Sequence, residues 1–442
     1  MPPAYAAGKK DDTTSQAMEV LRVNCLSCHN DEKEKGGLSL ATRERALKGG
    51  DNGPAFKSGK PDASALVKAL AADADPHMPP KKQLADNQIN LLKSWVKAGA
   101  KWDAAALAET GLTIKPVTLT PLPASYHPVL ALALSPDAKS LAVARANRIS
   151  ICAVGQTNQP VLHELQSHPD PVQSLAWSAD GKWLASGSFR RVILWNTAGF
   201  NPAREITEGL MDRITALEFT PDGATLIAAD GFTAQSGFVR LVESASGKAI
   251  ASWQAHNDTI FDLSLSKDGK LLSTASGDKL VKVWELDSRK ELARLEGHTS
   301  AIYAVAFNGE GTQLVSGGPD KEIKVWDVKT REKVATLGDN PKAGITALAW
   351  TPDSKNVFAA NESGVVFNYT ELKTHTGAER SSGGRERTIG SGTDILYSLA
   401  ATPDAKTVYA GAHDGSVLFW TDGKSGRFAV VEPAVPAPIT AR

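Results

Sequence analysis

Hydrophobic positions in the first hundred residues recur at helical intervals. In "TTSQAMEVLRVNCLSCH", which opens on a Ser/Thr cap, Met18, Leu21 and Cys25 follow one another at steps of three and four residues, so they share one face of a helix. The segments "KPDASALVKALA" and "LADNQINLLKSWVKAGA" repeat this period, and Asp86 is the expected N-cap of the second. Gly-rich chain separates the three segments. The pattern predicts a small all-α domain over residues 14–103.

The period changes to two after a Pro-rich linker at 104–126, whose "TIKPVTLTPL" is also a candidate closing strand. Over residues 127–433, strand-like runs precede a turn of the kind "SPDAK" or "SADGK" again and again. The third residue of each turn falls at positions 137, 180, 222, 268, 310, 353 and 404. A unit of 42 to 51 residues that holds four short strands cannot bury its faces alone, so the units must stack radially. The pattern predicts an all-β propeller of seven blades.

Two of these units resemble the WD repeat. The stretches "AHNDTIFDLSLSKDGKLLSTASGDKLVKVWE" and "EGHTSAIYAVAFNGEGTQLVSGGPDKEIKVWD" carry the residues of the family's structural tetrad, and the other units are degenerate. The resemblance implies hydrogen bonds that join a His to a Ser or Thr, an Asp and a Trp indole inside one blade, and it predicts two such sets, His256, Thr274, Asp278 and Trp284, and His298, Ser316, Asp320 and Trp326. Their role would be to satisfy buried polar groups and not to do chemistry.

Composition and charge narrow the class of protein. The chain has 442 residues, of which 49 are Lys or Arg and 49 are Asp or Glu, and this balance gives no indication of a nucleic-acid partner. No apolar run reaches the length of a membrane span. The start "MPPAYAAGKKDD" has no apolar segment, yet "AYA" resembles the end of a signal peptide. We expect an export signal to be missing from this sequence, with Met1 in its place.

The cluster "NCLSCHN" is the strongest chemical signal in the chain. Cys25 and Cys28 lie three apart and His29 follows, a spacing that suits two thioether bonds to haem and an imidazole below the iron. A zinc site would need further ligands, and Cys152 is the only other cysteine. A thioredoxin-like redox pair would need a strand–helix unit behind it, and none is visible. The motif predicts one covalently attached haem c.

A haem iron bound by His29 has a second axial position. Met18, His77 and Met78 are the candidates within the helical domain. Met18 lies on the stripe that also carries the cluster, which indicates a core residue. Met78 precedes two prolines in "ADPHMPPKKQL", which would hold it rigidly. A thioether ligand would also raise the reduction potential. We expect Met78 to be the ligand, with His77 as the alternative.

Residues 15–102 closely resemble the Planctomycete-type cytochrome c domain. The signatures Gly-Gly-Leu, Gly-Gly-x-x-Gly-Pro, Met-Pro-Pro and Trp-Val-x-x-Gly-Ala stand in the family's order. The resemblance implies that Cys25 and Cys28 bind haem covalently, with His29 as proximal and Met78 as distal ligand. The backbone of Gly49, Gly50 and Gly53 either approaches a haem propionate or forms a simple tight turn. Trp95 lies either in the haem crevice or in an ordinary core.

The predicted function is electron transfer. A haem with both axial positions filled passes electrons instead of binding substrate, and the propeller would dock a redox partner or another protein. An oxidoreductase whose propeller binds a second cofactor, and a scaffold whose haem only stabilises a small domain, are the alternatives. No catalytic residue is assigned. The resemblance to cytochromes c implies a periplasmic or otherwise exported protein.

Overall fold

The computed structural model describes most of the helical region and of the propeller. It covers residues 12–26, 28–30, 34–80, 83–103, 107, 122, 127–155, 159–166, 168–337, 342–370, 372, 385–392, 394–421 and 424–429. The chain divides into two compact units, residues 1–116 and 117–442. Each unit is described by itself.

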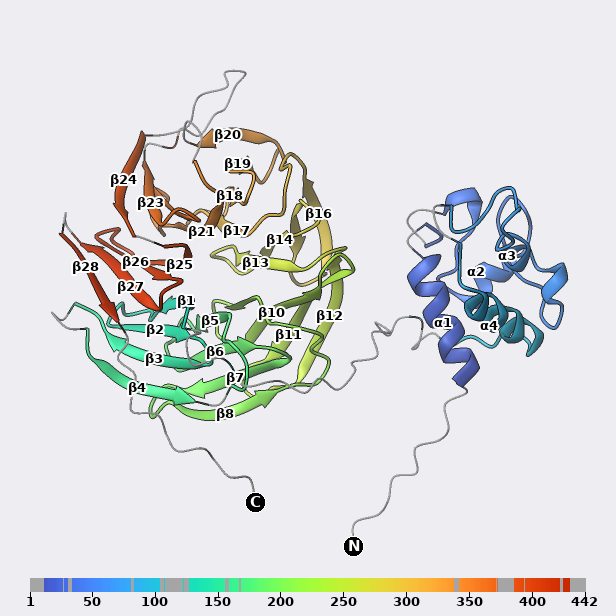
Figure 1. Ribbon diagram of the computed structural model, residues 1–442, viewed down its shortest axis with the longest axis horizontal. Coiled ribbons are helices and arrows are strands. Elements are labelled where there is room, and N and C mark those ends of the chain that lie inside the picture. The colour runs from blue at the N-terminus through green and yellow to red at the C-terminus, as the bar shows by residue number, and fades with distance from the viewer. Residues whose placement is uncertain are drawn as a thin grey trace, which may run out of the picture. The chain divides into compact units, whose positions relative to one another are not determined.

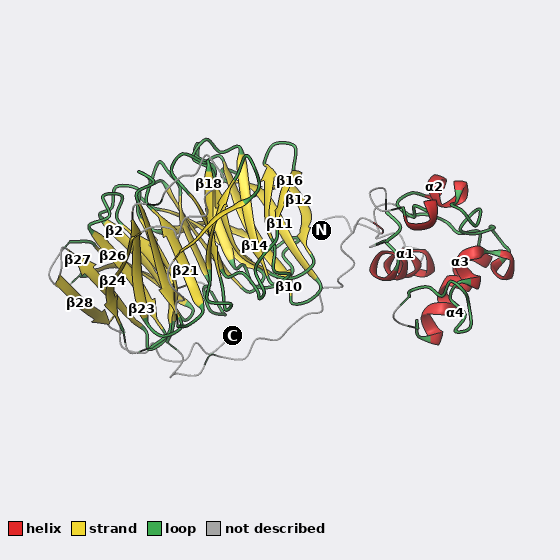
Figure 2. Cartoon of the chain, turned by 90° about the horizontal axis from the view of Figure 1, so that it is seen from above, coloured by secondary structure: helices red, strands yellow, loops and turns green. Residues whose placement is uncertain are grey.

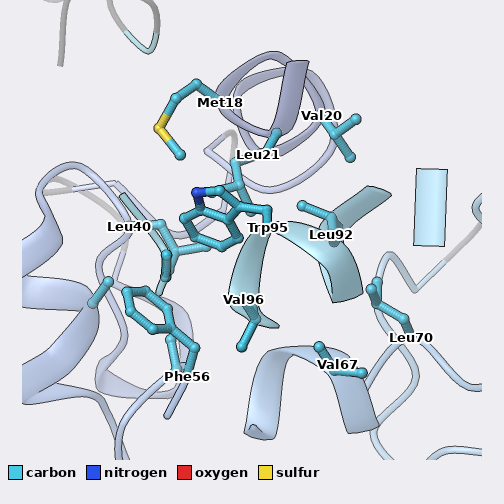
Figure 3. Packing of buried hydrophobic residues seen from close by; sticks show 14 of the residues in the cluster. Met18, Val20, Leu21, Leu40, Phe56, Val67, Leu70, Leu92, Trp95 and Val96 are labelled. Carbon is cyan, nitrogen blue, oxygen red and sulfur yellow. The ribbon is translucent and has the colours of Figure 1, made fainter. Parts of the chain in front are cut away.

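The first unit is made of short helices around one small core. The α-helices are α1 (Asp12–Asn24), α2 (Arg43–Lys48), α3 (Ala65–Lys68) and α4 (Asp86–Lys97), and two 3₁₀ helices span Lys35–Gly37 and Pro61–Ala63. Helix α1 packs against α4 (Figure 1). Their apolar stripes meet in the core, where Met18 and Leu21 of α1 face Leu92, Trp95 and Val96 of α4 (Figure 3). The predicted all-α domain is therefore present.

The start of α4 differs from the sequence expectation by one residue. Ala85, with extended backbone, is the N-cap, and Asp86 is the first helical residue. The side-chain Oε1 of Gln88 accepts the Ala85 N–H at 3.3 Å, which is half of a capping box. An acidic residue in the first turn still interacts favourably with the helix dipole. The predicted stop is present, because Gly99 has φ of +100° just after the helix.

The second unit is the predicted propeller of seven four-stranded sheets (Figures 1 and 2). Each sheet is one blade, built from four strands that are consecutive in sequence. Blades one to four are β1 (Val129–Leu134), β2 (Ser140–Arg145), β3 (Arg148–Ala153) and β4 (Val161–Gln166); β5 (Ser174–Trp177), β6 (Trp183–Ser188), β7 (Arg191–Asn196) and β8 (Asn201–Ile206); β9 (Ala216–Phe219), β10 (Thr225–Phe232), β11 (Ser236–Glu243) and β12 (Ala249–His256); and β13 (Ile260–Leu265), β14 (Leu271–Ser276), β15 (Val281–Glu285) and β16 (Lys290–Leu295). Blades five to seven are β17 (Ala304–Phe307), β18 (Gln313–Gly317), β19 (Ile323–Asp327) and β20 (Lys333–Leu337); β21 (Ile345–Trp350), β22 (Asn356–Asn361), β23 (Val365–Thr370) and β24 (Arg385–Ser391); and β25 (Leu396–Ala401), β26 (Thr407–Ala412), β27 (Ser416–Thr421) and β28 (Lys424–Ala429).

The repeated Asp-containing turn joins the first and second strands of a blade. In blade one the Ser135 hydroxyl donates to Asp137 Oδ1 at 2.7 Å, which also accepts the Lys139 N–H at 3.1 Å. These bonds lower the pKa of the Asp137 carboxyl. The same two bonds recur in five other blades, at Asp180, Asp222, Asp268, Asp353 and Asp404. In blade five, Asn308 Oδ1 accepts the N–H groups of Thr312 and Gln313 instead. The turn motif is therefore structural.

The last blade is completed from the C-terminal side. Strand β28 pairs with β27 as the fourth strand of blade seven. The first strand of blade one, β1, packs against β25 and β26, and the Ser398 hydroxyl donates to the Val129 carbonyl at 3.5 Å across this junction. The candidate closing strand within 104–126 lies outside the described residues, apart from 107 and 122.

Candidate functional site

The two cysteines and the histidine of the first motif lie on one tight turn after α1. The Cys25 N–H donates to the Leu21 carbonyl at 2.9 Å, and the His29 N–H donates to the Cys25 carbonyl at 3.0 Å. The helical bonding pattern therefore continues past Asn24 into the turn that carries the motif. Neither cysteine is in a disulfide, and both, like His29, are half-buried.

The surroundings of this turn are apolar. Burial, together with the charge of Cys28, raises the pKa of the Cys25 thiol to about 12. Cys25 and Leu26 pack against the helical core. The Nδ1 atom of His29 is buried and has no hydrogen-bond partner within the described residues. A buried ring nitrogen without a partner costs free energy, so the motif carries an unsatisfied polar group.

Met78 lies in the chain between α3 and α4. Its backbone N–H donates to the Ala69 carbonyl at 2.7 Å, which ties this loop to the end of α3. The Met78 side chain is half-buried. The neighbouring His77 is engaged, because its Nε2 lies 2.8 Å from Gln83 Oε1. Met18 is fully buried in the core (Figure 3), as the helical stripe predicted.

The Gly-rich segment before Pro54 forms a closed turn. The Gly50 N–H donates to the Gly53 carbonyl at 3.2 Å, and the Gly53 N–H donates to the Gly50 carbonyl at 2.9 Å. The Gly49 N–H donates to the Arg45 carbonyl and ends α2. All three N–H groups are therefore used within the turn. Of the two interpretations of these glycines, these backbone bonds favour the tight turn.

Trp95 is a core residue of α4. Its side chain is 1 % exposed, and its indole N–H donates to the Lys101 carbonyl at 2.7 Å. It packs edge-on against Phe56, with ring centroids 5.3 Å apart, and lies near Trp102. This aromatic group joins α4 to the loop after α2 and fixes the helical core that carries the cysteine motif.

The two predicted tetrads are both present in the propeller. In blade four, His256 Nε2 lies 2.7 Å from Thr274 Oγ1, which accepts the Trp284 indole N–H at 3.0 Å, and His256 Nδ1 lies 3.0 Å from the Asp278 carboxylate. In blade five, His298 Nε2 lies 2.8 Å from Ser316 Oγ, which accepts the Trp326 N–H at 2.8 Å, and His298 Nδ1 lies 2.7 Å from Asp320 Oδ2. Burial lowers the pKa of both histidines, against the opposing effect of the Asp. The imidazoles are neutral structural groups.

Blade two has a related network that the sequence interpretation missed. His168 Nε2 lies 2.7 Å from Ser186 Oγ, which accepts the Trp195 N–H at 2.8 Å. Phe189 stands where the Asp belongs, and the Ser188 hydroxyl takes the place of the carboxylate, 2.7 Å from His168 Nδ1. Burial without a carboxylate partner lowers the pKa of His168 to about 3. The signal was present in the sequence, since His168 precedes Ser186 by the same 18 residues that separate His256 from Thr274.

Blade three replaces the network with a buried ion pair. Arg240 Nε donates to Asp230 Oδ2 at 3.0 Å, and Arg240 Nη2 donates to Asp230 Oδ1 at 3.1 Å. The same carboxylate accepts the Met211 N–H at 2.7 Å, and Arg240 Nη1 reaches the Ser252 hydroxyl at 3.0 Å. The charges are thus paired in a bidentate geometry.

The described residues place no polar cluster of a metalloprotein type elsewhere. Within them, no group of three or more His, Cys, Asp or Glu side chains lies close enough to hold a metal ion. None of the described helices has the length and apolarity that crossing a membrane requires.

The fold and the site together define a small helical cytochrome-like domain followed by a seven-bladed WD-type propeller. Residues 25–82 match the family described as Planctomycete cytochrome C. Four segments match the WD domain, G-beta repeat, and they are residues 159–196, 247–285, 289–327 and 384–421. The chain therefore joins a Planctomycete cytochrome C domain to WD40 repeats, as the sequence predicted.

Similar curated proteins match through the propeller repeats. A WD repeat-containing protein of Synechocystis sp. is 33% identical over 122 residues, which cover 28% of this chain and 34% of that protein. Elongator complex protein 2 of Dictyostelium discoideum is 29% identical over 29% of this chain and 15% of its own length. Transcriptional corepressor LEUNIG_HOMOLOG of Arabidopsis thaliana is 41% identical over 33% of this chain and 18% of its own. The matched part spans about a third or less of each relative.

Proposed function

We propose that the protein is an electron carrier that binds one haem c in its helical domain and docks a redox partner or another protein on its propeller. Cys25 and Cys28 would hold the haem covalently, and His29 and Met78 would be the axial ligands. When bound, the haem supplies one-electron chemistry.

The observation that carries this proposal is the buried, unsatisfied Nδ1 of His29 in a motif whose two cysteines are not in a disulfide. The protein gives this buried atom no partner within the described residues, so the ring is free to orient toward an iron. The raised pKa of Cys25 reports an apolar environment, which suits the edge of a porphyrin. The backbone bonds of Cys25 and His29 fix the spacing that two thioether bonds require.

Met78 is favoured over its neighbour His77 as the second axial ligand. The imidazole of His77 is hydrogen-bonded to Gln83. In Met78 the backbone N–H is hydrogen-bonded to the Ala69 carbonyl. A loop held at its backbone with a half-buried thioether suits an axial ligand that must not move between oxidation states.

The propeller supports the docking role. Its four-residue networks and the Asp230–Arg240 pair satisfy buried polar groups inside the blades, which is a structural role. The surface of the propeller would bind a partner protein, because WD repeats commonly serve as protein-binding platforms. The expected place of action is the periplasm or another exported location, which the cytochrome resemblance supports.

The test is to produce the full chain together with haem-maturation machinery and to measure covalent haem by mass spectrometry and by the visible spectrum. Wild-type protein should carry one haem, and the double variant Cys25→Ala/Cys28→Ala should carry none. Cys152→Ala is the matched control, since this third thiol is buried in β3, and it should load haem as the wild type does. Covalent haem in the double variant would disprove attachment through Cys25 and Cys28. If the wild-type protein never binds haem, the electron-carrier proposal is wrong and an interaction scaffold is the remaining function.

A further inference from the structure

A cavity of about 750 Å³ lies between blades six and seven of the propeller. Its walls come from β22, β23 and β24 of blade six and from β26, β27 and β28 of blade seven, two sheets that Figure 1 shows as neighbours. The volume falls in the range of small-ligand sites. It is separate from the helical unit, so its use does not depend on haem loading.

The polar wall of this cavity is cationic. Arg387, Lys406, Lys424 and Arg427 line it, and none of its described lining residues is an Asp or Glu. Lys406 has a distant partner in Asp404, at 3.8 Å, and Arg427 pairs with Asp414. Across the described part of the propeller, no carboxylate forms an ion pair with Arg387 or Lys424. The cavity therefore attracts an anionic group.

The inner wall of the cavity is apolar. It includes Phe358, Val408 and Leu418, which are 1 %, 2 % and 9 % exposed and belong to the core between the two blades. Ile389 and the Trp420 ring continue this wall. A ligand that fills the cavity must therefore carry an apolar body next to its charge.

Trp420, a lining residue of the cavity, contributes an indole N–H that has no tetrad hydroxyl to donate to. In blade four the indole N–H of Trp284 donates to the Thr274 hydroxyl. Trp420 has the same place in blade seven, but Ala410 stands where Thr274 stands in blade four. The blade thus lacks the hydroxyl that would accept this N–H.

Gly390 explains why the Trp420 indole can lie on the cavity wall. A Cβ added at Gly390 would lie 1.6 Å from Trp420 Nε1. Only a residue without a side chain at this position of β24 allows the ring to rest against the strand of the neighbouring blade. Gly390 makes room for the Trp420 ring, and Ala410 offers no hydroxyl to its indole N–H. Together they leave this N–H at the cavity.

Asn368 contributes an unused acceptor. Its Nδ2 donates to Asn356 Oδ1 at 3.0 Å, but its own Oδ1 is buried and has no partner in the described chain. Asn368 is one of the lining residues. A buried carbonyl oxygen without a donor costs free energy that a bound hydroxyl or amine would recover.

We propose that the cavity between blades six and seven binds a small amphipathic anion, with a phosphate or carboxylate group on an aromatic or aliphatic body. Arg387 and Lys424 hold the anionic group, Phe358 and Leu418 contact the body, and the Trp420 N–H and Asn368 Oδ1 orient it. The site is a property of the propeller and goes beyond protein docking.

The experiment is calorimetric titration of the full-length protein with 1-naphthyl phosphate. Inorganic phosphate and 1-naphthol serve as probes that lack the body or the charge, and each should bind at least about tenfold more weakly. Arg387→Glu and Lys424→Glu should each weaken 1-naphthyl phosphate binding by about tenfold or more, because each replaces a charge-assisted contact by repulsion. Trp420→Phe, which removes the N–H together with the five-membered ring, should weaken binding by about fivefold or more.

The matched control is Lys333→Glu. Lys333 begins β20 of blade five, as Lys424 begins β28 of blade seven, so it changes the same charge at the same position of another blade. It should leave the affinity unchanged. The proposal is wrong if wild-type protein shows no binding at millimolar probe, or if the cavity variants and Lys333→Glu have equal affinities. If the peptide Asp-Glu-Phe-Asp binds more tightly than 1-naphthyl phosphate, the small-ligand proposal is wrong. The cavity would then bind an acidic segment of a partner protein.

Discussion

The Glu218 carboxylate accepts the backbone N–H of Leu265 at 2.8 Å, and this bond ties the first strand of blade three to the first strand of blade four. The next junction has the same device, because Asp262 Oδ2 accepts the Val305 N–H at 2.9 Å. The first strand of each blade pairs on one side only, so its other edge offers N–H groups that need acceptors. Carboxylates from the preceding blade supply them.

These carboxylates make the stability of the propeller depend on pH. Burial raises the pKa of Glu218 from its ordinary value of 4.5 to about 8 and that of Asp262 from 3.8 to about 7. Between those limits these two carboxyls hold protons in the folded state that they have released in the unfolded state, so their contribution to the free energy of unfolding should fall as pH rises from about 4 to about 8. Urea unfolding followed by tryptophan fluorescence across this range measures the slope.

The variant Glu218→Gln should flatten this dependence. The amide oxygen can still accept the Leu265 N–H, but it cannot ionise, so the variant should exceed the wild type in stability by about 1 kcal/mol or more at pH 8.5. Glu296→Gln, at an exposed position, should follow the wild-type curve. A stability difference between Glu218→Gln and the wild type that stays constant from pH 5 to 8.5 would contradict the assignment.

Loss of the central hydroxyl of a tetrad should destabilise its blade. Thr274→Val keeps the shape of the side chain but leaves His256 Nε2 and the Trp284 N–H without their shared partner. The expected cost is about 2 to 4 kcal/mol, since two buried groups lose a hydrogen bond. Chemical denaturation measures it, and Ser288→Ala, which removes an exposed hydroxyl, should cost less than about 0.5 kcal/mol. Equal effects of the two variants would remove the tetrad as a stabilising unit.

The Asp230–Arg240 pair should show strong coupling. Arg240→Met alone leaves a buried carboxylate without its cation, at a cost of about 3 to 5 kcal/mol. The double variant Asp230→Leu/Arg240→Met should recover much of this loss, because no charge is then buried. A double-mutant cycle of unfolding free energies gives the coupling. Additive effects would show that the pair does not act as a unit.

Met78 can be tested against its neighbour. In haem-loaded protein, Met78→Ala should lower the reduction potential and allow carbon monoxide to bind the reduced iron, because the second axial position opens. His77→Ala is the control and should leave the potential and the carbon monoxide response unchanged. The opposite outcome would make His77 the ligand.

The repeats of the propeller could be predicted because each blade repeats its turn chemistry. Asp137 and its equivalents form short bonds within a few residues, so the sequence shows them directly. The tetrads of blades four and five follow for the same reason, since their four residue types keep a fixed spacing. The helical domain was predicted from its apolar stripes, but helix α2 in the Gly-rich chain and the cap at Ala85 were not.

The parts that could not be predicted depend on contacts between distant segments. Ser188 replaces an Asp in blade two only because the backbone brings it to His168, and Glu218 meets Leu265 across a blade boundary. The glycines at 49, 50 and 53 were ambiguous because a tight turn and a ligand contact both require the same residue type. Whether the Met78 thioether meets an iron depends on a group that the sequence does not contain.

Every blade of this propeller is one uninterrupted stretch of chain, from β1–β4 to β25–β28. In the described ring no blade borrows a strand from the opposite end, and side-chain contacts such as Ser398 with Val129 close the junction. A gene for such a ring can gain or lose a whole blade by a single duplication or deletion, and its ends can be moved to another loop by circular permutation without cutting a sheet.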